Sequence, residues 1–548
     1  MTTTLARPDA GFVRSASEFT GTGRLLRLYL RRDRIVLPLW VLLLSLPLGS
    51  VYVTSTNKVY STPTELESFR QSILNSPAEL AMYGPMYNIS HGAAGVWKAG
   101  MFHAIIAIAT ILTVIRHTRA EEESGREELL AATRVGRLAN LTAALLLACG
   151  AAVATGVVSA LSISSAGVPL AGSLAFGLAE AGAGVVFATV AAVTAQLSAS
   201  ARTARGIGFA VLATAFLLRA VGDMRSGDGP ANPLTWLSPL GWSLQVRPFA
   251  GDRWWVLSLH VVAAVLLTLL AYALLRHRDL GAGLLAERLG PPTAGRALTG
   301  PIGLAWRLQR GTIVAWTIGF ALYGTVIGSV VHGIGDQIGS SKTAIDVIER
   351  LGGTQRLEDA VLVAMFTMLG LMAAGMSISS ALRLSGEENA DRAEPVLAAA
   401  VGRIRWATSH LLFALAGPAL ALLVSGLCCG VVYGIAAHDV SGKLGRVLGG
   451  ALVQLPAVWV FTGLAVAGFG LLPRRASTVW GLFVAAVALY LIGSVGDMPQ
   501  GLLDLNPFAH LPKLPGGEFA VLPVAVLLAI AAALITVGLY GFRRRDLR

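Results

Sequence analysis

Charge is scarce in this sequence. Only 14% of its 548 residues are charged, whereas 54% are hydrophobic. Soluble domains carry about 25% charged residues. A charged fraction this low over a chain this long excludes an ordinary soluble protein. It predicts an all-α, polytopic membrane protein that lies in the lipid bilayer.

Side chains that perform chemistry are also scarce. The three cysteines, Cys149, Cys428 and Cys429, all fall inside apolar runs, and the nine histidines are scattered along the chain. The sequence contains no His-Glu-x-x-His motif and no cysteine pair at metal-ligand spacing. Isolated cysteines in apolar runs are typical small core residues, not a disulfide framework or a metal site. We therefore expect no metal, no catalytic residue and no enzyme activity in this chain.

A motif for binding ATP is missing as well. A phosphate-binding loop needs the pattern Gly-x-x-x-x-Gly-Lys-Ser/Thr after a strand. The nearest string is Gly339-Ser340-Ser341-Lys342-Thr343, which lacks the second glycine beside the lysine. We therefore expect this chain to hold no nucleotide cofactor of its own.

Lysine is rare among the basic residues. Five of the 43 lysines and arginines are lysine, and the formal net charge is +12. In a soluble protein this excess would suggest a nucleic-acid partner, but in a membrane protein it reports arginine placed on the cytoplasmic side. Most of the basic residues fall on one side when the N-terminus is placed inside. We expect no nucleic-acid partner, a location in the cell membrane, and cytoplasmic N- and C-termini.

Long apolar runs are abundant. A helix needs about 20 apolar residues to cross the hydrocarbon layer, and twelve runs meet this need. In the first half they are 35–56, 96–115, 138–166, 172–197, 206–221 and 254–275. In the second half they are 311–332, 360–382, 406–437, 447–471, 477–495 and 520–541.

A charged stretch occurs twice, each time between the second and third spans of a half. We call residues 121–137 the first cassette and residues 387–403 the second cassette. They align without a gap, and eight of seventeen positions are identical. Both read Glu-Glu-x-x-x-Arg-x-Glu, then six residues, then Val-Gly-Arg. A solvated loop has no physical need to repeat its acidic spacing, so we favour a recognition surface over a plain loop.

Other features repeat in the same order. Arg278-Asp279-Leu280 recurs as Arg545-Asp546-Leu547, and a basic amphipathic stretch precedes the first span of each half, at 21–34 and 303–310. We interpret these stretches as elbow helices at the membrane surface. The chain thus predicts two parallel six-span halves, 1–278 and 303–548, joined by a Gly- and Pro-rich cytoplasmic linker, 279–302.

This layout and the cassette pattern resemble the coupling regions of ABC-2 type exporter permeases. The doubled form is similar to the fused twelve-span actinobacterial permeases of the tetronasin-transport and mycobacterial multidrug-efflux type. The resemblance implies a permease subunit that exports hydrophobic or amphiphilic drugs and antibiotics. It also implies two copies of a separate ATPase subunit, which hold ATP and Mg and dock on the two cassettes. The implied coupling residues are Glu121, Glu122, Arg126, Glu128, Gly136, Arg137, Glu387, Glu388, Arg392, Glu394, Gly402 and Arg403.

Candidates for the cargo pathway lie inside the spans. Glu180 falls well within the fourth span, where a charge is costly unless it faces protein or water. Its alternative role is a protonated or hydrogen-bonded helix contact. Four methionines, Met365, Met368, Met372 and Met376, lie at helical spacing on the eighth span. Methionine suits varied apolar cargo, but such a stripe is also ordinary packing.

Two other functions remain as alternatives. A proton-coupled secondary drug transporter with six plus six helices needs titratable groups at the midplane of both halves. Glu180 has no acidic counterpart near residue 450. A lipid-modifying membrane enzyme needs a clustered catalytic constellation near the membrane surface, and the sequence has none.

Overall fold

Helices make up all the regular structure of the described chain. The computed structural model describes residues 17–126, 133–227, 229–279, 281–285, 300–332, 357–493 and 500–546, with single positions at 292, 293, 295 and 298. Every regular element within these residues is a helix, which confirms the predicted all-α class. The chain divides into two compact units, Met1–Leu289 and Gly290–Arg548. Each unit has a hydrophobic core of its own.

Eleven helical segments of the described chain are long and apolar enough to cross a membrane. They are Val36–Val59, His91–Glu123, Ala139–Ser165, Leu170–Leu197, Ala201–Ser226, Trp254–Arg276, Pro301–Val331, Leu357–Asn389, Arg403–Ala436, Val440–Leu471 and Val521–Arg544. They confirm a polytopic membrane protein. The remaining predicted span, 477–495, coincides with helix α25 (Val479–Gly493), beyond which residues 494–499 are not described. The total of twelve therefore stays a prediction.

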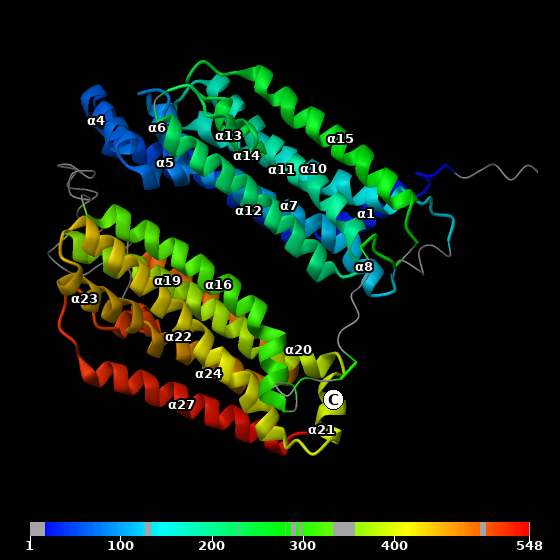
Figure 1. Cartoon of the computed structure of the whole chain (residues 1–548), viewed down its shortest axis with the longest axis vertical. Coiled ribbons are helices and arrows are strands. Elements are labelled where there is room, and N and C mark those ends of the chain that lie inside the picture. Colours follow the sequence, from blue (N-terminus) through cyan, green and yellow to red (C-terminus); the bar gives the residue numbers. More distant parts are fainter. Residues whose placement is uncertain are drawn as a thin grey trace, which may run out of the picture. The chain divides into compact units, whose positions relative to one another are not determined.

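The first unit places its long helices side by side (Figure 1). They are α2 (Val36–Pro47), α7 (Phe102–His117), α10 (Ala139–Ser165), α11 (Leu170–Leu197), α12 (Ala201–Ser226) and α15 (Leu257–Arg276). Helix α11 is central, because α7, α10, α12 and α15 all pack against it. Most of its buried apolar residues are glycine or alanine, so the neighbouring backbones approach closely.

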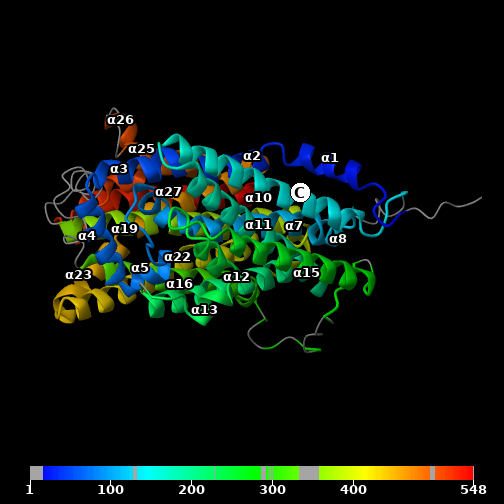
Figure 2. The same ribbon diagram turned by 90° about the horizontal axis from the view of Figure 1, so that it is seen from above.

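The two ends of the first unit carry different short helices. One end holds α4 (Pro63–Leu74), α5 (Pro77–Tyr83), α6 (His91–Trp97), α13 (Pro233–Trp236) and α14 (Pro239–Gln245). The other end holds α1 (Thr22–Arg32) and α8 (Arg119–Glu123), and the turned view in Figure 2 shows the same separation. The first cassette begins in α8, so it lies at the end that also carries α1.

The second unit repeats this plan (Figure 1). Its long helices are α16 (Pro301–Val331), α19 (Leu357–Ala381), α22 (Arg403–Ala436), α24 (Leu455–Leu471), α25 and α27 (Val521–Arg544). Helix α23 (Val440–Leu452) lies at one end, and α20 (Arg383–Asn389) and α21 (Ala393–Ala398) lie at the other. The second cassette runs through α20 and α21, so each cassette caps one end of its own helix bundle.

The two predicted elbow helices differ. Residues 22–32 form a separate helix, α1, which ends at Asp33 before the first span begins at Val36. In the second unit α16 runs without a break from Pro301 to Val331, so its basic first turns belong to the spanning helix itself. At the turn after α1, the carboxylate of Asp33 pairs with His117 and Arg116.

Candidate functional site at the two cassettes

The first cassette follows directly on the second span. Helix α8 extends α7 by one short turn, and after an undescribed stretch, 127–132, the chain enters α10 through Val135, Gly136 and Arg137. A β-carbon on Gly136 would lie 2.2 Å from the carbonyl oxygen of Glu18. Glycine is therefore required there by the close approach of the N-terminal segment. Gly402 of the second cassette has open space around it, so the same glycine has no such packing role.

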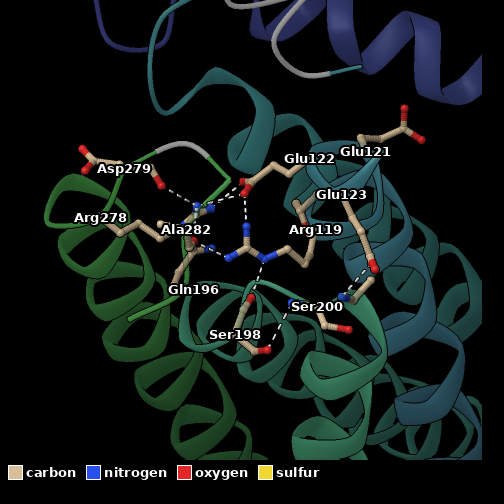
Figure 3. A network of polar contacts seen from close by, with 12 residues as sticks. Arg119, Glu121, Glu122, Glu123, Gln196, Ser198, Ser200, Arg278, Asp279 and Ala282 are labelled. Carbon is tan, nitrogen blue, oxygen red and sulfur yellow. Dashed lines mark hydrogen bonds and ion pairs between the residues drawn. The ribbon is translucent and has the colours of Figure 1, made fainter. Parts of the chain in front are cut away.

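Glu122 of the first cassette lies between two arginines (Figure 3). Arg278 places both terminal nitrogens on the carboxylate, with Nη1 2.9 Å from Oε2. Arg119 also donates from Nη1 to Oε2 of this carboxylate. All three side chains are buried. Such charge-assisted, forked contacts are strong and directional, and the removal of one partner leaves an uncompensated buried charge.

Glu388 of the second cassette makes the corresponding contact. Arg545 donates from Nη1 to Oε1 and from Nη2 to Oε2, each at 2.6 Å. Its guanidinium also lies over the rings of Phe469 and Phe542, at 4.9 and 5.2 Å from their centroids. An arginine that stacks on aromatic rings while it grips a carboxylate is fixed in position and orientation.

The arginine of each Val-Gly-Arg sequence binds the backbone next to the same ion pair. Arg137 donates to the backbone carbonyl of Arg278 at 2.6 Å, and Arg403 donates to the carbonyl of Arg545, also at 2.6 Å. Arg137 donates further to the carbonyl of Leu275, at 3.1 Å. The last carbonyls of a helix have no acceptor role inside the helix, and arginine satisfies them here. Each cassette therefore grips the end of the last helix of its unit, α15 or α27, at two points.

The leading glutamates, Glu121 and Glu387, are paired within their own cassettes. Arg126 approaches Glu121 at 3.3 Å, and Arg392 approaches Glu387 at 2.8 Å. Hydrogen bonding to the Glu387 carboxylate raises the pKa of Arg392 above its ordinary value. Glu121 also receives Arg32 from α1 at 2.6 Å, which joins the elbow helix to the cassette.

Few of the predicted coupling residues present their charge to solvent. The side chains of Glu122 and Glu388 are buried in internal ion pairs, and Glu121 and Glu387 are also buried. Arg126 and Arg392 are more than half exposed, and Glu394 in the first turn of α21 is exposed. Glu128 lies outside the described residues. Among the predicted coupling residues that the structure describes, the exposed charged side chains are Arg126, Arg137, Arg392 and Glu394, while Glu122 and Glu388 hold each cassette to its own bundle.

Sequence reasoning did not assign a role to Arg278, Arg545 or Arg119. The repeated Arg-Asp-Leu sequence was the available signal for the first two, because it recurs beside the end of each half. Arg119 had no such signal, since the matching position in the second half is Ser385. Its partners, Glu122 and the carbonyls of Ser198 and Ala282, come together only in the folded chain.

The predicted pathway residues occupy different environments. Glu180 of α11 is fully buried, and Ser159 of α10 donates to its Oε2 at 2.6 Å. Its Oε1 has no hydrogen-bond partner among the described residues. Met376 is buried in the core of the second unit and Met372 is exposed on its apolar surface, while Met365 and Met368 are half-buried against the core. The four methionines thus share a helix but not a common surface.

A small cavity opens at the far end of the first unit from the cassette. It has a volume of about 50 Å³ and is lined by Tyr87, Trp97, His103, Phe176 and Arg247, among others. The Arg247 guanidinium lies 3.9 Å from the Tyr87 ring centroid, and burial raises the pKa of the Tyr87 hydroxyl to about 12. A cavity of this size holds a few water molecules, so it is too small for a drug molecule in this conformation.

Comparison with known proteins gives two matches. The family described as "Multidrug efflux system permease Rv1217c, C-terminal domain" matches residues 35–277 and 298–543 of this chain. The chain is also similar to the multidrug efflux system permease protein Rv1217c of Mycobacterium tuberculosis (strain ATCC 25618 / H37Rv), with 57% identity over 532 residues. That alignment covers 97% of this chain and 96% of the relative.

Proposed function

Since this chain belongs to the family of the multidrug efflux system permease Rv1217c, we propose that it is the membrane-spanning subunit of an ATP-driven ABC-2 type drug exporter. The predicted resemblance to mycobacterial multidrug-efflux permeases is confirmed by the same matches. A permease of this family is a transport protein of the membrane.

A separate ATPase supplies the energy in this proposal. The sequence has no phosphate-binding loop, so ATP and Mg would be held by a partner chain. Two such subunits would dock, one on each cassette. The uneven distribution of basic residues between the two sides of the membrane favours cytoplasmic cassettes and cytoplasmic termini, as ATPase docking requires.

The observation that carries the proposal is the form of the two cassettes. Each caps one end of a helix bundle and lies between its second and third spanning segments. Each leaves an exposed arginine, Arg126 or Arg392, next to a glutamate that holds it in place. Two similar charged cassettes on two similar helix bundles match the two subunits of an ATPase dimer. Such a dimer would displace both bundles together.

The cargo in this proposal is a hydrophobic or amphiphilic small molecule. The relative is named a multidrug efflux permease, and we propose the same broad class for this chain. Ligand entry would come from the inner leaflet or the cytosol. Closure of the ATPase dimer would tilt the bundles and open a path outward.

The test is co-expression with the proposed ATPase subunit, followed by co-purification through a tag on this chain. Glu394→Arg, alone and with Arg126→Gln, changes only exposed charges of the cassettes. We expect these variants to lower ATPase recovery by about tenfold or more, because reversed charge opposes docking. Arg543→Glu is the matched control, since Arg543 is exposed at the end of α27 and outside both cassettes. Unchanged recovery in the cassette variants would remove the proposed docking role.

A proton-coupled transporter is the competing function, and the buried carboxyl of Glu180 is the observation in its favour. The energy source of transport distinguishes this alternative from the ATP-driven exporter. Efflux of ethidium is measured while the proton gradient is collapsed and ATP is held constant. Continued efflux supports the ATP-driven exporter, whereas loss of efflux at constant ATP favours the proton-coupled alternative.

A further inference from the structure

An arginine just beyond the last helix of each unit is held by its side chain and by its backbone carbonyl. Beyond α15, the Arg278 side chain grips Glu122 and its carbonyl accepts from Arg137. Beyond α27, the Arg545 side chain grips Glu388 and its carbonyl accepts from Arg403. The same three positions of the repeat therefore make the same two contacts in both units.

The surroundings of this link differ between the units. In the first unit, Arg119 adds a second guanidinium and the Gln196 side chain accepts from Arg278 Nε at 2.7 Å. In the second unit two aromatic rings, Phe469 and Phe542, take their place around Arg545. The arginine–glutamate pair and the arginine–carbonyl hydrogen bond are present in both units, although the residues around them differ. This indicates that the two contacts themselves are required.

The link joins parts that are otherwise far apart in the chain. The cassette follows the second span, and the arginine follows the last one, so Glu388 and Arg545 are 157 residues apart. The carboxylates are almost fully buried, at 5% exposure for Glu122 and 6% for Glu388. Buried, forked ion pairs keep their geometry, because displacement of one partner leaves the buried charge of the other uncompensated.

We infer that Arg278 and Arg545 are positioning residues that tether the last membrane helix of each unit to its cassette. Displacement of the cassette is then passed to α15 and α27, as well as to the spans that flank the cassette directly. The tether extends the proposed function and rests on it, because the push on the cassette comes from the proposed ATPase. It gives the Val-Gly-Arg arginines a role within the permease instead of at the ATPase surface.

The test uses the full chain co-expressed with the ATPase, and compares Arg545→Gln, Glu388→Gln and the double variant. Arg545→Lys keeps the charge but loses the fork, and Arg543→Gln is the matched control two residues earlier. We expect Arg545→Gln to keep ATPase recovery and ATP hydrolysis within about twofold of wild type while ethidium efflux falls about tenfold or more. The double variant is expected to lose no more efflux than either single variant, and Arg545→Lys to recover part of it.

A second measurement tests the tether without the ATPase. Hydrogen exchange of the α20 and α21 amides is expected to speed up in Arg545→Gln and to stay unchanged in Arg543→Gln. Wild-type efflux in Arg545→Gln, or efflux that falls only in parallel with protein yield and ATPase recovery, would overturn the inference. Failure of the proposed function gives a different result, because no ATPase would then co-purify with the wild-type chain. The hydrogen-exchange measurement would still test the tether in that case.

Discussion

Gly156 of α10 and Gly177 of α11 lie back to back where the two helices cross. A β-carbon on Gly156 would lie 2.2 Å from the Gly177 carbonyl oxygen, and one on Gly177 would lie 2.1 Å from that of Gly156. Backbone cannot give way as a flexible side chain does, so the helices must separate if either glycine gains a side chain. We expect Gly177→Ala to lower the free energy of unfolding by about 1–3 kcal/mol, measured by thermal unfolding of the detergent-solubilised protein.

Gly150 provides the control for this prediction. It lies on the same helix, α10, but a β-carbon there meets nothing within 4 Å. Gly150→Ala is expected to be neutral or slightly stabilising, because alanine is the better helix former. Equal effects at Gly150 and Gly177 would show that the close crossing contributes nothing to stability.

Glu79 in α5 predicts a pH-dependent stability. Burial raises the pKa of its carboxyl above the ordinary 4.5, against a smaller opposing effect of Lys98. A carboxyl whose folded pKa is raised adds stability below the unfolded pKa, and this is lost as the pH rises through the folded pKa. Glu79→Gln should therefore match the wild type in thermal unfolding below pH 4.5 and be more stable at a pH of about 8. A variant less stable than wild type at the higher pH would contradict the assignment.

Glu65 in the neighbouring helix α4 predicts the opposite sign. It closes a capping box with Thr62, and hydrogen bonds from Thr62 and Ser61 lower the pKa of its carboxyl. Such a group adds stability above the unfolded pKa, and this is lost as the pH falls through the folded pKa. Glu65→Gln is therefore expected to lower thermal stability at neutral pH and to have no effect in acid. The same unfolding series measures both glutamates, and parallel pH profiles would contradict at least one of the two explanations.

Asp33 predicts a local role for the turn after α1. Its carboxylate approaches His117 at 2.6 Å and Arg116 at 3.1 Å, and both Asp33 and His117 are buried. Asp33→Ala leaves these donors without their acceptor, at a cost of about 1.5–3 kcal/mol. We expect faster hydrogen exchange in α1 and no change in the central helix α11. Arg34→Ala, which alters an exposed residue next to Asp33, is the control and should change neither helix.

Substitutions of Glu180 are expected to affect protein stability and transport differently. Glutamine has nearly the same shape and still accepts from Ser159, so Glu180→Gln should leave protein yield and thermal unfolding unchanged. Glu180→Leu removes the acceptor and leaves the Ser159 hydroxyl unpaired, which is expected to cost about 1–3 kcal/mol. If Glu180 belongs to the cargo pathway, Glu180→Gln changes ethidium efflux at normal yield. Unchanged efflux identifies it as a helix contact only.

The two cassettes show which structural features a repeated sequence pattern predicts and which it does not. Their shared spacing predicts two similar sites on two similar halves, and the structure places each cassette at one end of its bundle. The pattern did not indicate which carboxylates face outward. Glu122 and Glu394 look alike as acidic positions, yet Glu122 is buried by Arg278 and Glu394 is exposed. That difference depends on the position of Arg278, which follows the last helix of the unit and is 156 residues beyond Glu122.

Local sequence alone determined the parts of this protein that depend on neighbours in the chain. Apolar runs of membrane length, interrupted by arginine clusters, are sufficient to predict a polytopic all-α membrane protein, because a helix satisfies its own backbone within a single segment. The duplicated cassette and the missing phosphate-binding loop likewise need no structure to be seen.

Only the tertiary structure decided what the charges of the cassettes hold. An ion pair such as Arg545 with Glu388 joins segments that are distant in sequence, and its burial depends on how whole helices pack. The same holds for the crossing of α10 and α11 and for the turn at Asp33. Contacts of this kind are set by the packing of helices in three dimensions, so no local pattern of residues specifies them.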